Sequence, residues 1–178
     1  MQTTYAVDIG GKVVELPVLD LEPGLRIAFF NLHGNIELTE YCAKLLAKLI
    51  IGADIILTAE SKGLQLAHCV ARELGHSVYA VARKTKKPYM REALETEVKS
   101  VTTGTLQRLY LSQSDAALLK GKKVAIVDDV ISGGGSVVGM ERLVLLSGGI
   151  VYKKAAVLAE GGAGKRDDIV FLAKIPLL

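Results

Sequence analysis

The sequence lacks several features that would place it among secreted or nucleic-acid-binding proteins. It has no tryptophan, 5% aromatic residues and two cysteines, and its 22 basic and 19 acidic residues leave a net charge of +3. Such a small charge argues against general binding to nucleic acid. Cys42 and Cys69 lie in apolar helical patterns without metal-ligand spacing, which indicates core thiols in a reducing compartment.

Long hydrophobic runs are also missing. No segment reaches the roughly 18 apolar residues that a membrane-spanning helix needs, and residues 1–5 lack the pattern of a signal peptide. We therefore expect a cytoplasmic protein without membrane contacts. Because half of its 178 residues are apolar, the chain can form one core, and we predict a single domain over residues 1–178.

What the sequence does contain is an alternation of strand and helix patterns. Apolar runs without polar alternation are typical of strands buried on both faces. Strands are predicted at residues 12–18, 26–30, 55–57, 77–82, 123–127 and 151–158, and helices at residues 37–51, 61–74 and 137–146. The fold class is therefore α/β, with a mostly parallel sheet flanked by helices.

Three polar loops are expected to meet at one edge of this sheet, because right-handed crossovers bring the carboxyl ends of parallel strands together. These loops are residues 58–63, 83–87 and 128–136. In the third, Ser132-Gly133-Gly134-Gly135-Ser136 stands between a strand and a helix start. Its backbone N–H groups can surround an anion that also interacts with the helix dipole, so the loop predicts a phosphate site.

Two common phosphate motifs do not fit this loop. The dinucleotide pattern would need a third glycine where Val138 stands, and no Gly-Lys-Ser/Thr ending is present. Neither motif explains Asp128 and Asp129, which we expect where the strand ends and meets water. Two carboxylates beside an anion site require a ligand with hydroxyl groups or a cation, and a ribose 5-phosphate offers hydroxyls as well as the phosphate.

The stretch Ile126–Ser136 resembles the phosphoribosyl-diphosphate (PRPP) motif of type I phosphoribosyltransferases, with serine at 132 and 136 where threonine is usual. Val81-Ala82-Arg83-Lys84 resembles the Arg-Lys strand end of the adenine and xanthine enzymes, and residues 58–63 stand where those enzymes have their pyrophosphate loop. The resemblance covers about residues 38–158.

This resemblance implies roles for individual residues. The ligands of the PRPP phosphate would be Val130, Ile131, Ser132, Gly133, Gly134, Gly135 and Ser136. The pyrophosphate ligands would be Glu60, Ser61, Lys62, Gly63, Arg83, Lys84 and Lys87, although a lysine-rich turn can also be merely solvated. Asp128, Asp129 and Lys84 would be the catalytic residues.

The implied reaction is the displacement of pyrophosphate from the anomeric carbon of PRPP by a nitrogen of a purine base. The implied cofactor is Mg²⁺, held by Asp128 and Asp129 directly or through water. The implied assembly is a homodimer, and the implied partners are PRPP and the base, without nucleic acid.

The family also has a small hood over the base and a flexible hairpin that closes the site, which correspond here to about residues 1–36 and 84–119 beside an α/β core at about residues 37–160. A strand-like stretch, residues 100–111, lies in the long interval. The alternative for this interval is a structural excursion at a dimer contact.

The candidate base-binding residues are Phe30, Asn31, His33 and Asn35, although Phe29 or Phe30 is more often a core residue than a stacking surface. Residues 31–37 resemble the xanthine enzymes and lack the Arg-Asp-Ile segment of the adenine enzymes. Adenine, xanthine, hypoxanthine and guanine all remain open.

Two other functions remain as alternatives. Some transcription regulators reuse this fold to bind PRPP without catalysis, but they need a DNA-binding domain, for which the strand-like first 40 or so residues are too few. A regulator that binds RNA through a basic face would fit poorly with a net charge of +3.

Overall fold

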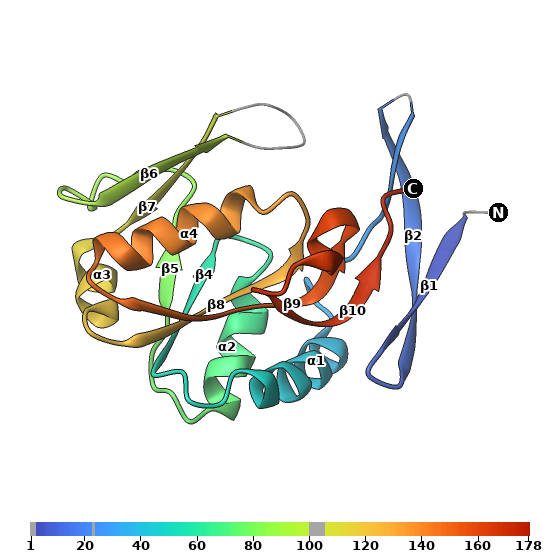
Figure 1. The fold of residues 1–178 in the computed structure, drawn as a ribbon, viewed down its shortest axis with the longest axis horizontal. Helices are drawn as coiled ribbons and strands as arrows, with labels where there is room; N and C mark the ends of the chain where they lie inside the picture. Colours follow the sequence, from blue (N-terminus) through green and yellow to red (C-terminus); the bar gives the residue numbers. More distant parts are fainter. Residues whose placement is uncertain (1–2, 23, 100–105) are drawn as a thin grey trace.

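The centre of the molecule is a parallel sheet of five strands in the order β10-β9-β8-β4-β5 (Figure 1). The computed structural model describes residues 3–22, 24–99 and 106–178. The strands of the central sheet are β4 (Ile55–Ala59), β5 (Ala80–Ala82), β8 (Lys123–Ile131), β9 (Ile150–Glu160) and β10 (Val170–Ile175). The prediction of an α/β fold with a mostly parallel sheet is confirmed.

Helices cover both faces of this sheet and create two separate cores. On one face, α1 (Ile36–Leu49) and α2 (Leu64–Glu73) pack against alternate strand residues such as Ala125 and Val127. On the other, α4 (Gly135–Leu146) packs against Ile126 and its neighbours, with α3 (Gln113–Leu119) beside it. Because successive side chains of a strand point to opposite faces, an uninterrupted apolar strand supplies both cores.

The two cysteines belong to the first of these faces. Cys42 is fully buried in α1, and burial raises the pKa of its thiol to about 12. Cys69 is partly buried against the same core. Both therefore serve as apolar packing groups, as the sequence predicts.

The N-terminal strands form a second, antiparallel sheet at one end of the molecule, beside β10 (Figure 1). Its strands are β1 (Thr4–Ile9), β2 (Lys12–Glu22) and β3 (Leu25–Ala28). The sequence did not predict β1 or β10 individually, and β3 ends before Phe29. The chain after β3 then runs toward the carboxyl edge of the central sheet.

The long interval after β5 contains a hairpin of β6 (Leu94–Lys99) and β7 (Leu106–Leu111). It packs on α4, where a Cβ on Gly139 would lie 2.8 Å from Leu109 Cδ1 and where Arg142 Nη1 donates to the Glu97 carbonyl at 2.7 Å. The predicted strand-like stretch 100–111 is confirmed for residues 106–111, and its residues 100–105 lie outside the described residues, whereas β6 was not predicted. The hairpin contacts the helix that follows the predicted phosphate loop.

Two strand boundaries also differ from the prediction. β5 is shorter than 77–82, whereas β8 continues past Val127 because Asp128, Val130 and Ile131 still pair with β9. A 3₁₀ turn, η1 (Gly161–Lys165), connects β9 to β10. No helix among the described residues has both the length and the apolar character needed to cross a membrane.

Candidate active site

The three predicted loops do meet at the carboxyl edge of the sheet. Contacts among their residues join the loop after β4, the strand end of β5 and the acidic end of β8. This is the edge where ligands bind in open α/β sheets. The strand order places β8 and β5 on either side of β4, so β4 brings the two outer loops within reach of each other.

The predicted phosphate loop, residues 132–136, turns tightly into α4. Gly134 is the N-cap of this helix and has φ +79°, a left-handed conformation that favours glycine. A cavity of about 170 Å³ opens here, lined by Gln107, Asp128 and residues 130–137. The cavity therefore lies at the start of a twelve-residue helix, where free N–H groups and the helix dipole favour an anion.

The two aspartates do not meet water in the way that the sequence suggested. Because β8 continues through them, Asp129 is only 4% exposed, and its N–H donates to Asp128 Oδ1 at 3.0 Å. Burial, and then the neighbouring charge of Asp129, raise the pKa of Asp128 above its ordinary value of 3.8. Asp128 is therefore a carboxyl group that gains from a nearby cation or hydroxyl donor.

Lys62 connects three parts of the site. Its Nζ lies 3.1 Å from Asp129 Oδ2, donates to the Phe30 carbonyl at 2.9 Å and sits 5.2 Å from the centre of the Phe29 ring. The prediction placed Lys62 among the pyrophosphate ligands. In this structure it neutralises the buried Asp129 and joins the acidic strand to the segment after β3.

Gly63 brings the loop after β4 against the acidic strand. A Cβ on this residue would lie 2.3 Å from Thr58 Oγ1 and 3.1 Å from Asp128 Oδ1. Its φ is −78°, so the requirement for glycine comes from the lack of space and not from strain. The backbone of this loop can therefore approach a ligand held at Asp128.

Glu60 gathers the cations of the neighbouring loop. Its carboxylate accepts from Arg83 Nη1 at 3.1 Å and from the Lys84 N–H at 2.8 Å. Burial acts to raise the pKa of Glu60, but these two donors and the charges of Arg83 and Lys87 outweigh it and the pKa is lowered. In this structure Glu60 therefore positions Arg83 and the backbone of Lys84, and its role as a pyrophosphate ligand stays a prediction.

The structure changes the set of candidate base-binding residues. Phe30 is 2% exposed in the core and offers no ring surface, whereas Phe29 is partly exposed under Lys62. Asn35 Oδ1 accepts from the Leu38 N–H and so caps α1. Asn31 and His33 remain exposed near the site, and His33 Nδ1 lies 3.2 Å from Gln65 Nε2 on α2.

Three contacts at the site were not predicted from the sequence: the Lys62–Asp129 ion pair, the position of Gln107 in the cavity wall, and the guanidinium of Arg166 against Gly134. Each joins residues far apart in the chain. No spacing rule connects such residues, although Lys62, inside the predicted loop 58–63, was already a candidate for binding a negative charge.

A family model, related sequences and solved structures all point to the same family. The phosphoribosyl transferase domain family matches residues 31–175. The adenine phosphoribosyltransferase of Rhodococcus jostii is 31% identical over 159 residues, which cover 88% of this chain and 84% of that protein. The enzyme of the same name from Mycobacteroides abscessus is 33% identical over 161 residues, with the same coverage of 88% and 84%.

Among solved structures, the adenine phosphoribosyltransferase of Thermoanaerobacter pseudethanolicus superposes with a TM-score of 0.73 at 26% identity. The superposition covers 90% of this chain and 95% of that protein.

Proposed function

Because the chain belongs to the phosphoribosyltransferase family, we propose that it transfers the ribose 5-phosphate of PRPP to a purine base and releases pyrophosphate. One observation carries this proposal: Asp128 and Asp129 lie between a glycine-rich helix N-terminus on one side and a cationic loop on the other. PRPP has the matching order of groups, since its ribose hydroxyls lie between a phosphate and a pyrophosphate.

The phosphate loop holds the end of the substrate that stays with the product. The N–H groups at the start of α4, with the hydroxyls of Ser132 and Ser136, bind the 5-phosphate in the 170 Å³ cavity. Asp128 accepts hydrogen bonds from the ribose hydroxyls. These contacts fix the position of the anomeric carbon, which makes displacement at that carbon effectively intramolecular.

The opposite loop holds the leaving group. Arg83 and Lys84, gathered by Glu60, supply positive charge as the bond to pyrophosphate breaks, and Gly63 lets backbone N–H groups approach. Positive charge develops on the ribose ring in an oxocarbenium-like transition state, close to the carboxylates of Asp128 and Asp129. Preorganised charges of this kind contribute most when water is excluded.

We also propose Mg²⁺ as the cofactor, held by Asp128. Among the described residues, no group of three or more His, Cys, Asp or Glu side chains converges as a metal cage. This arrangement fits Mg²⁺, which is usually held by one or two carboxylates together with substrate phosphates and water. When bound, the ion would neutralise charge on the departing pyrophosphate.

Adenine is the base that we propose first, because the two relatives described above, which align over most of this chain, are named adenine phosphoribosyltransferases. The exposed Asn31 and His33, beside Phe29, are the groups available to a base. A homodimer and a cytoplasmic location remain predictions; light scattering of the purified protein tests the first of these.

The proposal is tested by measuring pyrophosphate release from PRPP and Mg²⁺ with adenine, xanthine, hypoxanthine, guanine, uracil and orotate. We expect turnover with one purine, and a decrease of at least about a hundredfold in the Asp128→Asn/Asp129→Asn variant. Asp20→Asn is the matched control, because Asp20 is exposed on β2 and pairs only with Arg26 among the described residues. Binding of PRPP without turnover of any base would instead support a PRPP-sensing regulator.

A further inference from the structure

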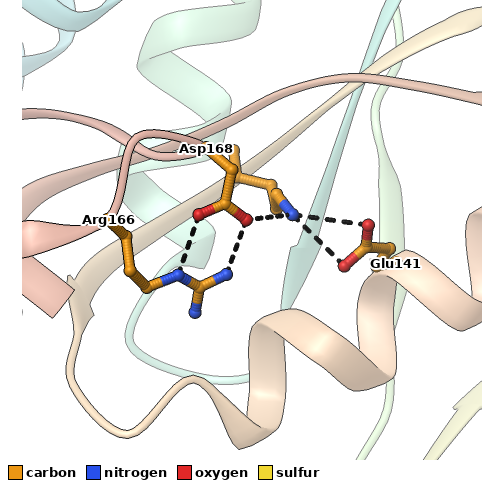
Figure 2. A network of polar contacts seen from close by, with 4 residues as sticks. Glu141, Arg166 and Asp168 are labelled. Atoms are coloured by element: carbon orange, nitrogen blue, oxygen red, sulfur yellow. Dashed lines mark hydrogen bonds and ion pairs between the residues drawn. The ribbon is translucent and has the colours of Figure 1, made fainter. Parts of the chain in front are cut away.

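Behind the phosphate loop lies a network of four charged side chains that the proposed chemistry does not use. Arg166 donates to Asp168 through Nε at 2.9 Å and Nη2 at 2.7 Å. Asp168 Oδ2 lies 2.6 Å from Lys154 Nζ, which also contacts both carboxylate oxygens of Glu141 at 3.3 Å. Figure 2 shows these side chains as one connected chain of contacts.

The network joins three segments around the loop. Glu141 belongs to α4, the helix that the loop begins, Lys154 belongs to β9, and Arg166 and Asp168 follow η1. Lys154 is only 8% exposed. Because a buried ammonium group is costly unless it is paired, its two carboxylate partners fix its position, and Lys154 in turn fixes Asp168.

Arg166 connects this network to the loop itself. Its Nη1 lies so close to Gly134 that a Cβ there would be 2.7 Å away, while Gly134 lines the cavity and Arg166 is not among the described residues that do. The guanidinium therefore packs on Gly134 from outside the cavity. Paired hydrogen bonds to one carboxylate hold a guanidinium in a single plane, which an isolated charge would not do.

The charges of the network balance, since two cations face two carboxylates. The network therefore adds no net charge beside the loop. The pKa of Asp168 is lowered because Arg166 and then Lys154 donate hydrogen bonds to it. A network without net charge would attract phosphate only weakly, so its role is not purely electrostatic. The same neutral network is well suited to holding the left-handed turn at Gly134 in place.

We propose that Arg166, held by Asp168, is a positioning residue for the 5-phosphate of the substrate. By packing on Gly134, it keeps the turn in the conformation that directs the N–H groups of the loop into the cavity. This inference rests on the proposed function and adds to it a residue 32 positions after Gly134 in the sequence.

The test separates the two ends of PRPP. Isothermal titration calorimetry measures the Kd of ribose 5-phosphate, which reports on the loop, and the Kd of pyrophosphate, which reports on the Arg83 side. The variants are Arg166→Ala, Arg166→Lys and Asp168→Asn, with Arg72→Ala as a matched control because its ion pair with Glu40 is exposed and far from this network. Thermal melts of every variant verify folding.

We expect Arg166→Ala to raise the Kd of ribose 5-phosphate by about tenfold and to change the Kd of pyrophosphate by less than about twofold. Asp168→Asn should also weaken ribose 5-phosphate although it keeps the arginine, and Arg166→Lys should recover only part of the loss. In turnover assays, the KM for PRPP should rise while kcat stays within about threefold.

Equal binding of ribose 5-phosphate by Arg166→Ala and the parent protein would overturn the inference and leave the proposed function intact. Normal binding by Asp168→Asn would overturn the positioning role, because charge alone would then be sufficient. A parent protein that binds neither ligand would overturn the proposed function and the inference together.

Discussion

The two regions that we propose to bind anions differ in the groups that they offer to a ligand. The phosphate loop relies on backbone N–H groups at the start of α4 and has a charge-neutral network behind it. The loops after β4 and β5 instead rely on side-chain cations, with Lys84 exposed and Arg83 and Lys87 partly exposed around Glu60. In the proposed reaction, a backbone cradle suits the phosphate that remains with the product, and exposed cationic side chains suit a group that must leave.

The largest effects should come from the two glycines at which these regions approach their neighbours. Gly63→Ala places a Cβ 2.3 Å from Thr58 Oγ1 and presses on Asp128, so turnover should fall by about a hundredfold or more, chiefly through weaker pyrophosphate binding. Gly134→Ala combines φ +79° with a clash against Arg166 and should weaken ribose 5-phosphate instead. Calorimetry with each ligand measures both effects.

Gly162→Ala is the matched control for these variants, because a Cβ there meets open space and the residue lies in the η1 turn. It should change neither Kd. If Gly63→Ala and Gly134→Ala weakened the same ligand, the assignment of one ligand end to each region would be wrong.

The cationic region should respond next most strongly. Arg83→Ala and Lys84→Ala should each weaken pyrophosphate by about tenfold, because charge-assisted contacts are lost. Pyrophosphate binding should also fall steeply between low and moderate salt, since exposed charges are screened over about 10 Å at 0.1 M ionic strength. Titrations in increasing KCl measure this dependence.

Ribose 5-phosphate binding gives the contrasting result in the same salt series. Because its donors are backbone N–H groups at a helix end, its Kd should change less with salt than that of pyrophosphate. A salt dependence as steep as that of pyrophosphate would contradict the distinction between the two regions.

A smaller effect is expected from the serine hydroxyls of the phosphate loop. Ser132→Ala and Ser136→Ala should each weaken ribose 5-phosphate binding by about three- to tenfold, because one hydroxyl donor is lost while the backbone donors remain. Threonine at either position keeps the hydroxyl and serves as the control. Loss of all binding in an alanine variant would show that the hydroxyls, and not the backbone, carry the affinity.

The smallest effect concerns pH and stability of the unliganded protein. Since burial and Asp129 raise the pKa of Asp128 in the folded state, its contribution to stability is fully present below the unfolded value near 3.8 and is lost as pH rises through the raised value. Asp128→Asn should therefore have a Tm roughly 2–4 °C higher than the parent above that range, and no advantage at acidic pH. Melts across pH measure the difference, which Asp20→Asn should not show.

The parts of the fold that were predicted correctly depend on local patterns. The burial of α1, β4 and β8 can be deduced from their own apolar patterns, and the α/β class followed from these elements. The strands β6 and β10 were missed because neither is a continuous buried run: every second residue of β6 is charged, and most of β10 is only partly buried.

The site was predicted unevenly for the same reason. The glycine loop and the acidic pair form one continuous motif, whereas the burial of Asp129 depends on β8 remaining paired with β9 beyond Val127. Phe30 was a candidate for base binding until the structure placed it in the core. Arg166 contacts Gly134, and Lys62 contacts Asp129. A single sequence does not reveal such contacts between distant residues.

The position of Lys62 has a consequence for the order of events in the unliganded site. Its ammonium group lies at once against Asp129, the Phe30 carbonyl and the face of Phe29. The protein thus carries an internal counterion that compensates the acidic strand before any ligand arrives. If pyrophosphate binds Lys62 as we propose, substrate entry is an exchange of ionic partners that releases both the Asp129 carboxylate and the face of Phe29.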